Sequence, residues 1–184
     1  MLLTAIFSTI LSVVCGGLYT FFRTSVWLSL TITFATTAYH FIMRLTIGHI
    51  INAVFHNNID YTKQWFKPYR FEKKLYASLK VHKWKDKLPT YSPDFFKLSK
   101  NNLELIAGSM CQAEIVHEII AVLSFLPIIA SRWFGSTLVF TFTSIAAALF
   151  DLLFVILQRY NRPRIIAILK RNKTKIKITQ DKNK

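Results

Sequence analysis

Long runs of uncharged, mostly apolar residues dominate the pattern along the chain. Residues 1–22 contain no charged side chain, residues 24–43 contain none apart from the neutral His40, and residues 133–150 contain none. A helix needs about 20 such residues to cross the hydrocarbon core of a bilayer. The pattern therefore predicts an all-α, polytopic integral membrane protein. The four predicted transmembrane helices lie near residues 2–22, 25–45, 112–131 and 134–157.

The third predicted span differs from the others because it contains ionisable side chains. The thirteen residues after Glu118 include no Asp, Glu, Lys or Arg, but they are too few to cross a membrane. A spanning helix must therefore begin near Cys111 and include Glu114, His117 and Glu118. Ionisable groups at membrane depth cost about 2.5–3.5 kcal/mol each on insertion scales, so they need partners or a polar cavity. We therefore expect the functional site here.

The net charge of +15 is concentrated in two blocks. Residues 57–110 contain eleven Lys or Arg against five Asp or Glu, and residues 159–184 contain ten against one. With four spans both blocks lie on one side, and the positive-inside rule places them and both termini in the cytoplasm. The chain lacks a nucleic-acid recognition motif, so we expect anionic lipid headgroups as the partners of these charges. The first span has no basic n-region and is interpreted as a retained span.

The two basic blocks also predict interfacial structure. Phe71, Leu75 and Leu79 recur at helical spacing among lysines, which is typical of an amphipathic helix in the membrane interface. Pro89 and Pro93 should end any helix there. Pro163 is expected to kink or break the chain, and a short basic amphipathic helix should follow it. The Lys- and Asn-rich tail, residues 172–184, is expected to be disordered.

Under this topology the ionisable side chains of three helices converge at their cytoplasmic ends. His40 and Arg44 share a face of the second helix, and Asp151 lies in the fourth about 10 Å from its end. We interpret them, with Glu118, as supporting residues. The fourth helix then delivers a set of polar side chains suited to gripping a phosphate or carboxylate. That set is Arg159, Asn161, Arg162 and Arg164.

Several chemistries are compatible with this set. His117 held by Glu114 could act as the general base that activates a hydroxyl for attack on an acyl group. Cys111 could carry the acyl group as a thioester, although nothing in the pattern requires this. A metal site is less favoured, because Glu-x-x-His occurs once and Ala121 breaks a His-Glu-x-x-His signature. The remaining alternative is that the charges only neutralise one another between helices.

Three motifs resemble the glycosyl-4,4'-diaponeurosporenoate acyltransferase family. They are Lys83-Trp84-Lys85-Asp86-Lys87-Leu88-Pro89, Cys111-Gln112-Ala113-Glu114-x-x-His117 and Gln158-Arg159-Tyr160-Asn161-Arg162-Pro163-Arg164. The resemblance covers roughly residues 70–170 and adds Trp84 to the supporting residues. It implies a small membrane protein of the bacterial cell membrane that esterifies a fatty acyl chain onto the sugar of a carotenoid glycoside. This chain departs from the family pattern at Gln112 and Glu118, so the resemblance does not identify the acceptor.

The leading hypothesis is a membrane acyltransferase at the cytoplasmic leaflet. His117, oriented by Glu114, would deprotonate a hydroxyl of a lipid-linked or glycosylated acceptor. The donor would be acyl-CoA or a phospholipid, with no further cofactor and no metal. The alternatives are a non-catalytic membrane adaptor, which binds anionic lipid or protein partners, and a metal-dependent membrane hydrolase.

Overall fold

The computed structural model describes residues 1–85, 103–135 and 137–182, and every regular element in these ranges is a helix. The helices are α1 Leu2–Phe22, α2 Ser25–Phe55, the short 3-10 turn η1 Gln64–Phe66, α3 Glu72–Ser78, α4 Val81–Trp84, α5 Leu103–Leu123, α6 Pro127–Phe134 and α7 Thr137–Lys182. Within these described ranges, four segments are long and apolar enough to cross a membrane: α1, α2, α5 with α6, and α7. The predicted fold class, all-α with four helices long and apolar enough to span a membrane, is confirmed. Pro89 and Pro93 lie outside the described residues.

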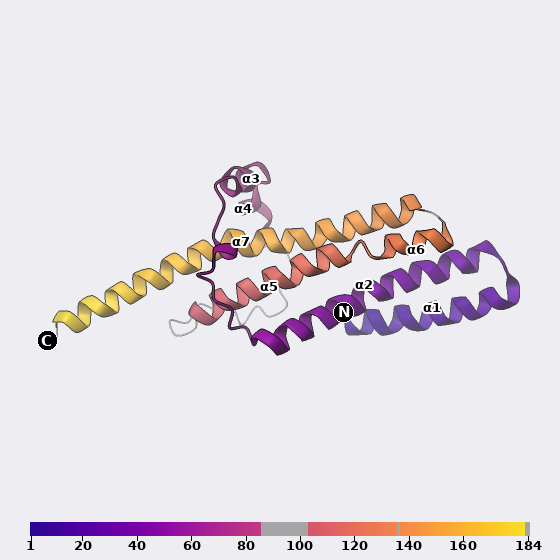
Figure 1. The fold of residues 1–184 in the computed structure, drawn as a ribbon, viewed down its shortest axis with the longest axis horizontal. Helices are drawn as coiled ribbons and strands as arrows, with labels where there is room; N and C mark the ends of the chain where they lie inside the picture. The colour runs from indigo at the N-terminus through magenta and orange to yellow at the C-terminus, as the bar shows by residue number, and fades with distance from the viewer. Residues whose placement is uncertain (86–102, 136, 183–184) are drawn as a thin grey trace. The chain divides into compact units, whose positions relative to one another are not determined.

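The chain divides into two compact units, which we describe separately. The first contains Met1–Ala53 and Ile119–Leu149, and the second contains Val54–Glu118 and Phe150–Lys184. In the first unit α1 and α2 form an antiparallel hairpin that turns at Arg23, whose backbone is left-handed with φ 51° (Figure 1). Their large apolar side chains are mostly exposed, as at Phe21 with 85%. Such exposure is expected where lipid is the surrounding solvent.

A proline interrupts the third spanning segment. Pro127 begins α6, and its missing N–H cannot bond to the carbonyl of Leu123. That carbonyl instead accepts the backbone N–H of Leu126 at 3.1 Å and the hydroxyl of Tyr39 from α2 at 2.8 Å. Side chains and local turns commonly satisfy backbone groups freed by proline at membrane depth. The first unit is thus tied together at the break that Pro127 creates.

The second unit places α5 beside the part of α7 between Asp151 and Lys173, and the two helices run antiparallel (Figure 1). The start of α5 differs from the expected position, because the helix begins at Leu103 rather than near 112. Its first turns bury Leu103, Ile106 and Met110, which recur at i, i+3 and i+7. The Glu114–Glu118 segment consequently lies in the middle of a long helix, not at its beginning.

Three further expectations about helix ends are corrected. α7 runs through Pro163 without a break. On the turn before the proline, Arg159 is bound to Glu72 and Arg162 to the Phe66 carbonyl oxygen. The tail expected to be disordered over 172–184 is helical as far as Lys182. The predicted interfacial helix, α3, ends at Ser78 and is therefore shorter than the apolar repeat from Phe71 to Leu79. Two residues after its end, Lys80 has a left-handed backbone conformation with φ 50°.

Gly108 allows the chain that follows α2 to approach α5 closely. A Cβ at this position would lie 2.8 Å from the carbonyl oxygen of Asn57 and 3.2 Å from that of Ile59. The side-chain oxygen of Gln112, one turn further along α5, accepts the backbone N–H of Asn57 at 2.8 Å. Gly108 and Gln112 therefore hold the incoming segment against the helix.

We expect Gly108→Ala to destabilise the protein, although alanine normally favours a helix interior over glycine by about 1 kcal/mol. The added methyl group meets backbone atoms that cannot rotate away, and overpacking of this kind costs about 1–3 kcal/mol. Thermal unfolding in detergent micelles measures the difference. Gly48→Ala in α2 is the matched control, because a Cβ there meets nothing within 4 Å. A Gly108 variant as stable as the Gly48 variant would contradict the close approach.

Candidate functional site

A buried network of ion pairs joins α3, α5 and α7 in the second unit. We call it the arginine–carboxylate cluster; its members are Glu72, Glu114, Arg159 and Arg162. The Glu114 carboxylate, fully buried, accepts hydrogen bonds from both guanidinium groups, from Arg159 at 2.5 Å and from Arg162. Arg159 also donates from Nε to Glu72 Oε1 at 2.8 Å. Two carboxylates face two guanidinium groups, so the cluster is electrically balanced.

The same arginines cap the 3-10 turn η1. Backbone carbonyls at the end of a short helical turn lack partners within it. Arg159 donates to the carbonyl oxygens of Trp65 at 3.1 Å and Lys67 at 3.0 Å, and Arg162 donates to that of Phe66 at 2.7 Å. The guanidinium of Arg162 also lies 5.1 Å from the centroid of the Phe66 ring. The planar fork of arginine, with five donors, explains why lysine would not serve here.

Glu72 connects the cluster to an outer layer of tyrosines. Its Oε2 accepts the hydroxyl of Tyr76 at 2.7 Å, and the Tyr76 ring packs edge-on against Tyr160. Burial and this hydrogen bond raise the pKa of Tyr76, so its hydroxyl stays protonated at neutral pH and continues to donate. Sequence reasoning missed Glu72. The available signal was that it is the only acidic residue among the basic residues from Lys63 to Lys85.

His117 pairs with Asp151, not with Glu114 as predicted from the sequence. Its Nδ1 lies 3.0 Å from Asp151 Oδ1, and the ring stacks on Phe154 with centroids 4.7 Å apart. Glu114 is fully engaged by the two arginines, which explains why it does not orient the histidine. We call His117 and Asp151 the His–Asp dyad. Asp151 is therefore promoted from a supporting residue to the direct partner of the histidine.

The dyad combines a buried carboxylate with an accessible imidazole. The Asp151 side chain is 1% exposed, whereas that of His117 is 24% exposed. Because Asp151 engages Nδ1, a neutral ring would carry its proton there and present the lone pair of Nε2. This is the arrangement in which a carboxylate holds a histidine as a general base.

The other predicted site residues are distributed as follows. Asn161 and Arg164 lie on a different face of α7 from Arg159, and Arg164 donates to the Tyr160 hydroxyl at 2.9 Å. Glu118 accepts the indole N–H of Trp65 at 3.2 Å. Trp84 donates to the Leu79 carbonyl oxygen at 2.9 Å at the end of α4.

His40 and Arg44 belong to α2 in the first unit, and their supporting role stays a prediction. There Arg44 Nη1 lies 3.4 Å from the His40 carbonyl oxygen, and the His40 ring packs edge-on against Tyr39. Cys111 is fully buried beside Ile59 and Phe66, which argues against its use as an acyl carrier. Among the residues that the structure describes, no group of three His, Cys, Asp or Glu is arranged to hold a metal ion.

The fold and the site together define an all-helical membrane protein whose candidate chemistry is acid–base chemistry at a His–Asp dyad. Residues 62–171, well over half of the chain, match the family model described as glycosyl-4,4'-diaponeurosporenoate acyltransferase, and the chain belongs to this family. The matched region contains both the dyad and the arginine–carboxylate cluster. No curated protein and no solved structure matches the chain significantly.

Proposed function

We propose that this protein transfers a fatty acyl chain onto a hydroxyl of a lipid-linked or glycosylated acceptor in the membrane. The observation that carries the proposal is the 3.0 Å contact of the half-buried His117 with the buried Asp151. The family's name supports acyl transfer as the reaction, and it makes a glycosylated carotenoid one candidate acceptor.

His117 Nε2 takes the proton of the acceptor hydroxyl as its oxygen attacks the acyl carbonyl carbon. A new C–O ester bond forms, the bond from the acyl carbon to its donor breaks, and the leaving group receives the proton from Nε2–H. The Asp151 carboxylate stabilises the imidazolium in between. The Phe154 ring stacks on the His117 imidazole and helps to fix the orientation of that ring. Direct transfer is favoured over an acyl-enzyme, because the Cys111 thiol is fully buried.

The arginines have a positioning role in this proposal. Arg159 and Arg162 were expected to grip a phosphate or carboxylate of the substrate, but Glu72 and Glu114 already occupy their guanidinium groups. Removing either arginine from its carboxylate would leave a buried charge uncompensated. We therefore assign the cluster to holding η1 and α3 beside the dyad-bearing helices α5 and α7.

The dyad is proposed to act at the cytoplasmic leaflet of the bacterial cell membrane. The support is the excess of basic residues in 57–110 and 159–184, which the positive-inside rule assigns to the cytoplasm. The donor is proposed to be acyl-CoA or a phospholipid, both of which are accessible from that side. The chemistry at His117 requires no further cofactor.

Comparative lipidomics of membranes from cells that express the wild type or His117→Ala tests the proposal. We expect a lipid that has gained one fatty acyl mass only with the wild type, because the variant lacks the base. The mass of that lipid also identifies the acceptor. His82→Ala is the matched control, since it makes the same substitution at an exposed histidine in α4, and it should retain the product.

Identical lipid profiles, with both proteins present in the membrane, would overturn acyl transfer and favour a membrane adaptor. Stoichiometric zinc or iron in the purified protein would instead favour a metal-dependent hydrolase.

A further inference from the structure

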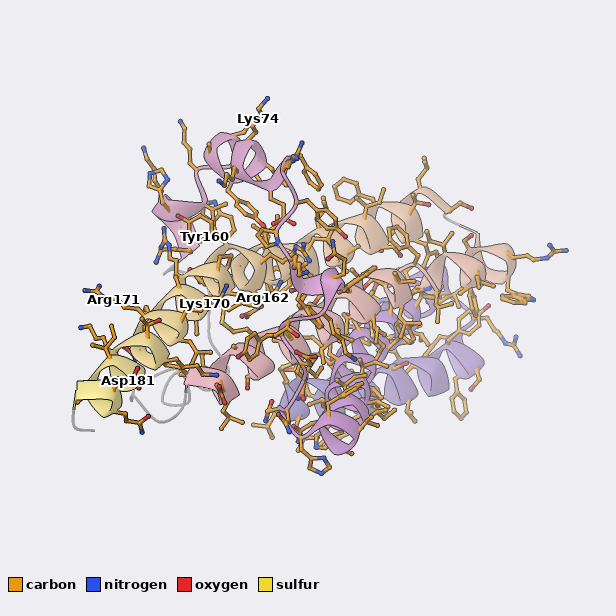
Figure 2. All side chains as sticks on the ribbon, turned by 60° about the vertical axis from the view of Figure 1, so that its left-hand side comes forward. Lys74, Tyr160, Arg162, Lys170, Arg171 and Asp181 are labelled. Carbon is orange, nitrogen blue, oxygen red and sulfur yellow. The ribbon has the colours of Figure 1, made fainter. Side chains whose placement is uncertain are left out.

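The segment that follows α2 presents both charge and apolar surface outward. We call residues 63–83 the basic lobe; it contains η1, α3 and most of α4. Its seven exposed cations are Lys63, Lys67, Arg70, Lys73, Lys74, Lys80 and Lys83. Its single carboxylate, Glu72, is buried and paired with Arg159. The accessible surface of the lobe is consequently cationic, and Lys74 projects from its outer side (Figure 2).

An apolar stripe runs along the exposed side of the same lobe. Phe71, Leu75 and Leu79 recur every four residues, and Phe71 and Leu79 are the cap residues of α3 with helical backbone angles, so the three lie on one side of this helix. They are 63%, 37% and 42% exposed. The Tyr69 ring stacks on Phe71 with centroids 5.7 Å apart, which extends this surface. Glu72 and Tyr76 occupy the neighbouring face that is turned toward the protein. The part of the chain that the structure describes therefore leaves the stripe exposed.

The contact between α3 and α7 indicates that the apolar stripe lies at the level of the lipid headgroups. From Thr137 to Gln158 the only charged residue of α7 is Asp151, and Arg159 is the first cation after this apolar stretch. The end of such a stretch marks the level of the lipid headgroups. Because Glu72 is bonded to Arg159, α3 is tied to α7 at this level. An exposed stripe of Phe and Leu flanked by lysines at headgroup depth matches an interfacial amphipathic helix.

We propose that the basic lobe is a binding surface for the anionic phospholipids of the bilayer that contains the chain. Phe71, Leu75 and Leu79 insert below the headgroups, and the surrounding lysines pair with lipid phosphates. Trp65, which is 58% exposed at the start of the lobe, is suited to the same depth. The proposal does not depend on acyl transfer.

Spin labels on the full-length protein test this proposal. The label is placed at Leu75→Cys on the stripe or at Ala77→Cys, which is exposed on the opposite face of α3. The native Cys15 and Cys111 are buried, so the unsubstituted protein serves as the labelling control. The protein is reconstituted in vesicles of phosphatidylcholine with phosphatidylglycerol. Collisions with oxygen, which enriches in hydrocarbon, are compared with collisions with a water-soluble nickel chelate.

We expect the Leu75 label to collide mainly with oxygen and the Ala77 label mainly with the chelate. Adding Lys73→Glu and Lys74→Glu, or omitting phosphatidylglycerol, should shift the Leu75 label toward the chelate. A Leu75 label as accessible to the chelate as the Ala77 label would overturn the proposal, because the lobe would then stand in water. A Leu75 label that neither oxygen nor the chelate reaches would also overturn it, because the stripe would then be covered by this chain or by a second copy of it. A Leu75 label that stays in the hydrocarbon after the charge reversal would overturn the role of anionic lipid.

Discussion

Asp151→Asn is expected to reduce the rate of acyl transfer by about 10²–10⁴-fold, the usual contribution of general acid–base catalysis. Asp151 Oδ1 contacts Nδ1 of His117 at 3.0 Å from a nearly fully buried position. An asparagine amide at this distance can donate to Nδ1, which would move the ring proton to Nε2 and remove the base. It also supplies no negative charge to stabilise the imidazolium. Initial rates on the product identified by lipidomics measure the effect.

The Asp151 experiment requires a control for expression and for the chemical change itself. Asp181→Asn makes the same substitution at an exposed position of α7 and should leave the rate unchanged. Because asparagine is nearly the same size as aspartate, the Asp151 variant should accumulate like the wild type. A folded Asp151→Asn protein with the full rate would remove this residue from the mechanism.

Glu114→Gln is expected to lower the free energy of unfolding by about 3–5 kcal/mol, which is typical when one partner of a buried ion pair is removed. The change leaves Arg162, 1% exposed, without a carboxylate, and leaves Arg159 with Glu72 alone. Thermal or denaturant unfolding in micelles measures the loss. Glu104→Gln on the same helix removes an exposed pair with Lys173 and should change stability by less than about 1 kcal/mol.

A second substitution distinguishes an uncompensated charge from a general packing defect. Adding Arg162→Gln to Glu114→Gln removes the orphaned guanidinium, so the double variant should be more stable than Glu114→Gln alone. If the two losses simply add, the buried charge is not the cause of the destabilisation, and the argument for the arginine–carboxylate cluster fails.

Most of the helical architecture could be predicted from the sequence, whereas several helix ends could not. The first predicted span, 2–22, coincides with α1. The start of α5 was missed, although Leu103, Ile106 and Met110 are buried there. The segment that follows α2 packs against this part of α5 at Gly108, and such a long-range contact cannot be read from local sequence. The break at Pro163 was expected from local preference, but α7 continues through it, next to the ion pairs of Arg159 and Arg162.

The candidate site, like the fold, could be predicted from the sequence only in part. Sequence reasoning found His117, Glu114 and Asp151, because ionisable residues within apolar spans are costly and must have partners. It predicted that Glu114 orients His117, because the two residues are spaced i, i+3 on one helix. In the structure each of them has its partner on α7 instead. It also missed Glu72, whose partner Arg159 lies 87 positions further along the chain.

The sequence by itself determined that this protein is helical, that it has four segments long and apolar enough to cross a membrane, and that the ionisable side chains within those segments need partners. Hydrophobic run length and the cost of buried charge depend on composition and local order, so they can be read along the chain. Only the tertiary structure decided that Asp151 holds His117 while Arg159 and Arg162 neutralise Glu114. Those pairings depend on the register of α5 against α7, which is set by packing between segments distant in sequence.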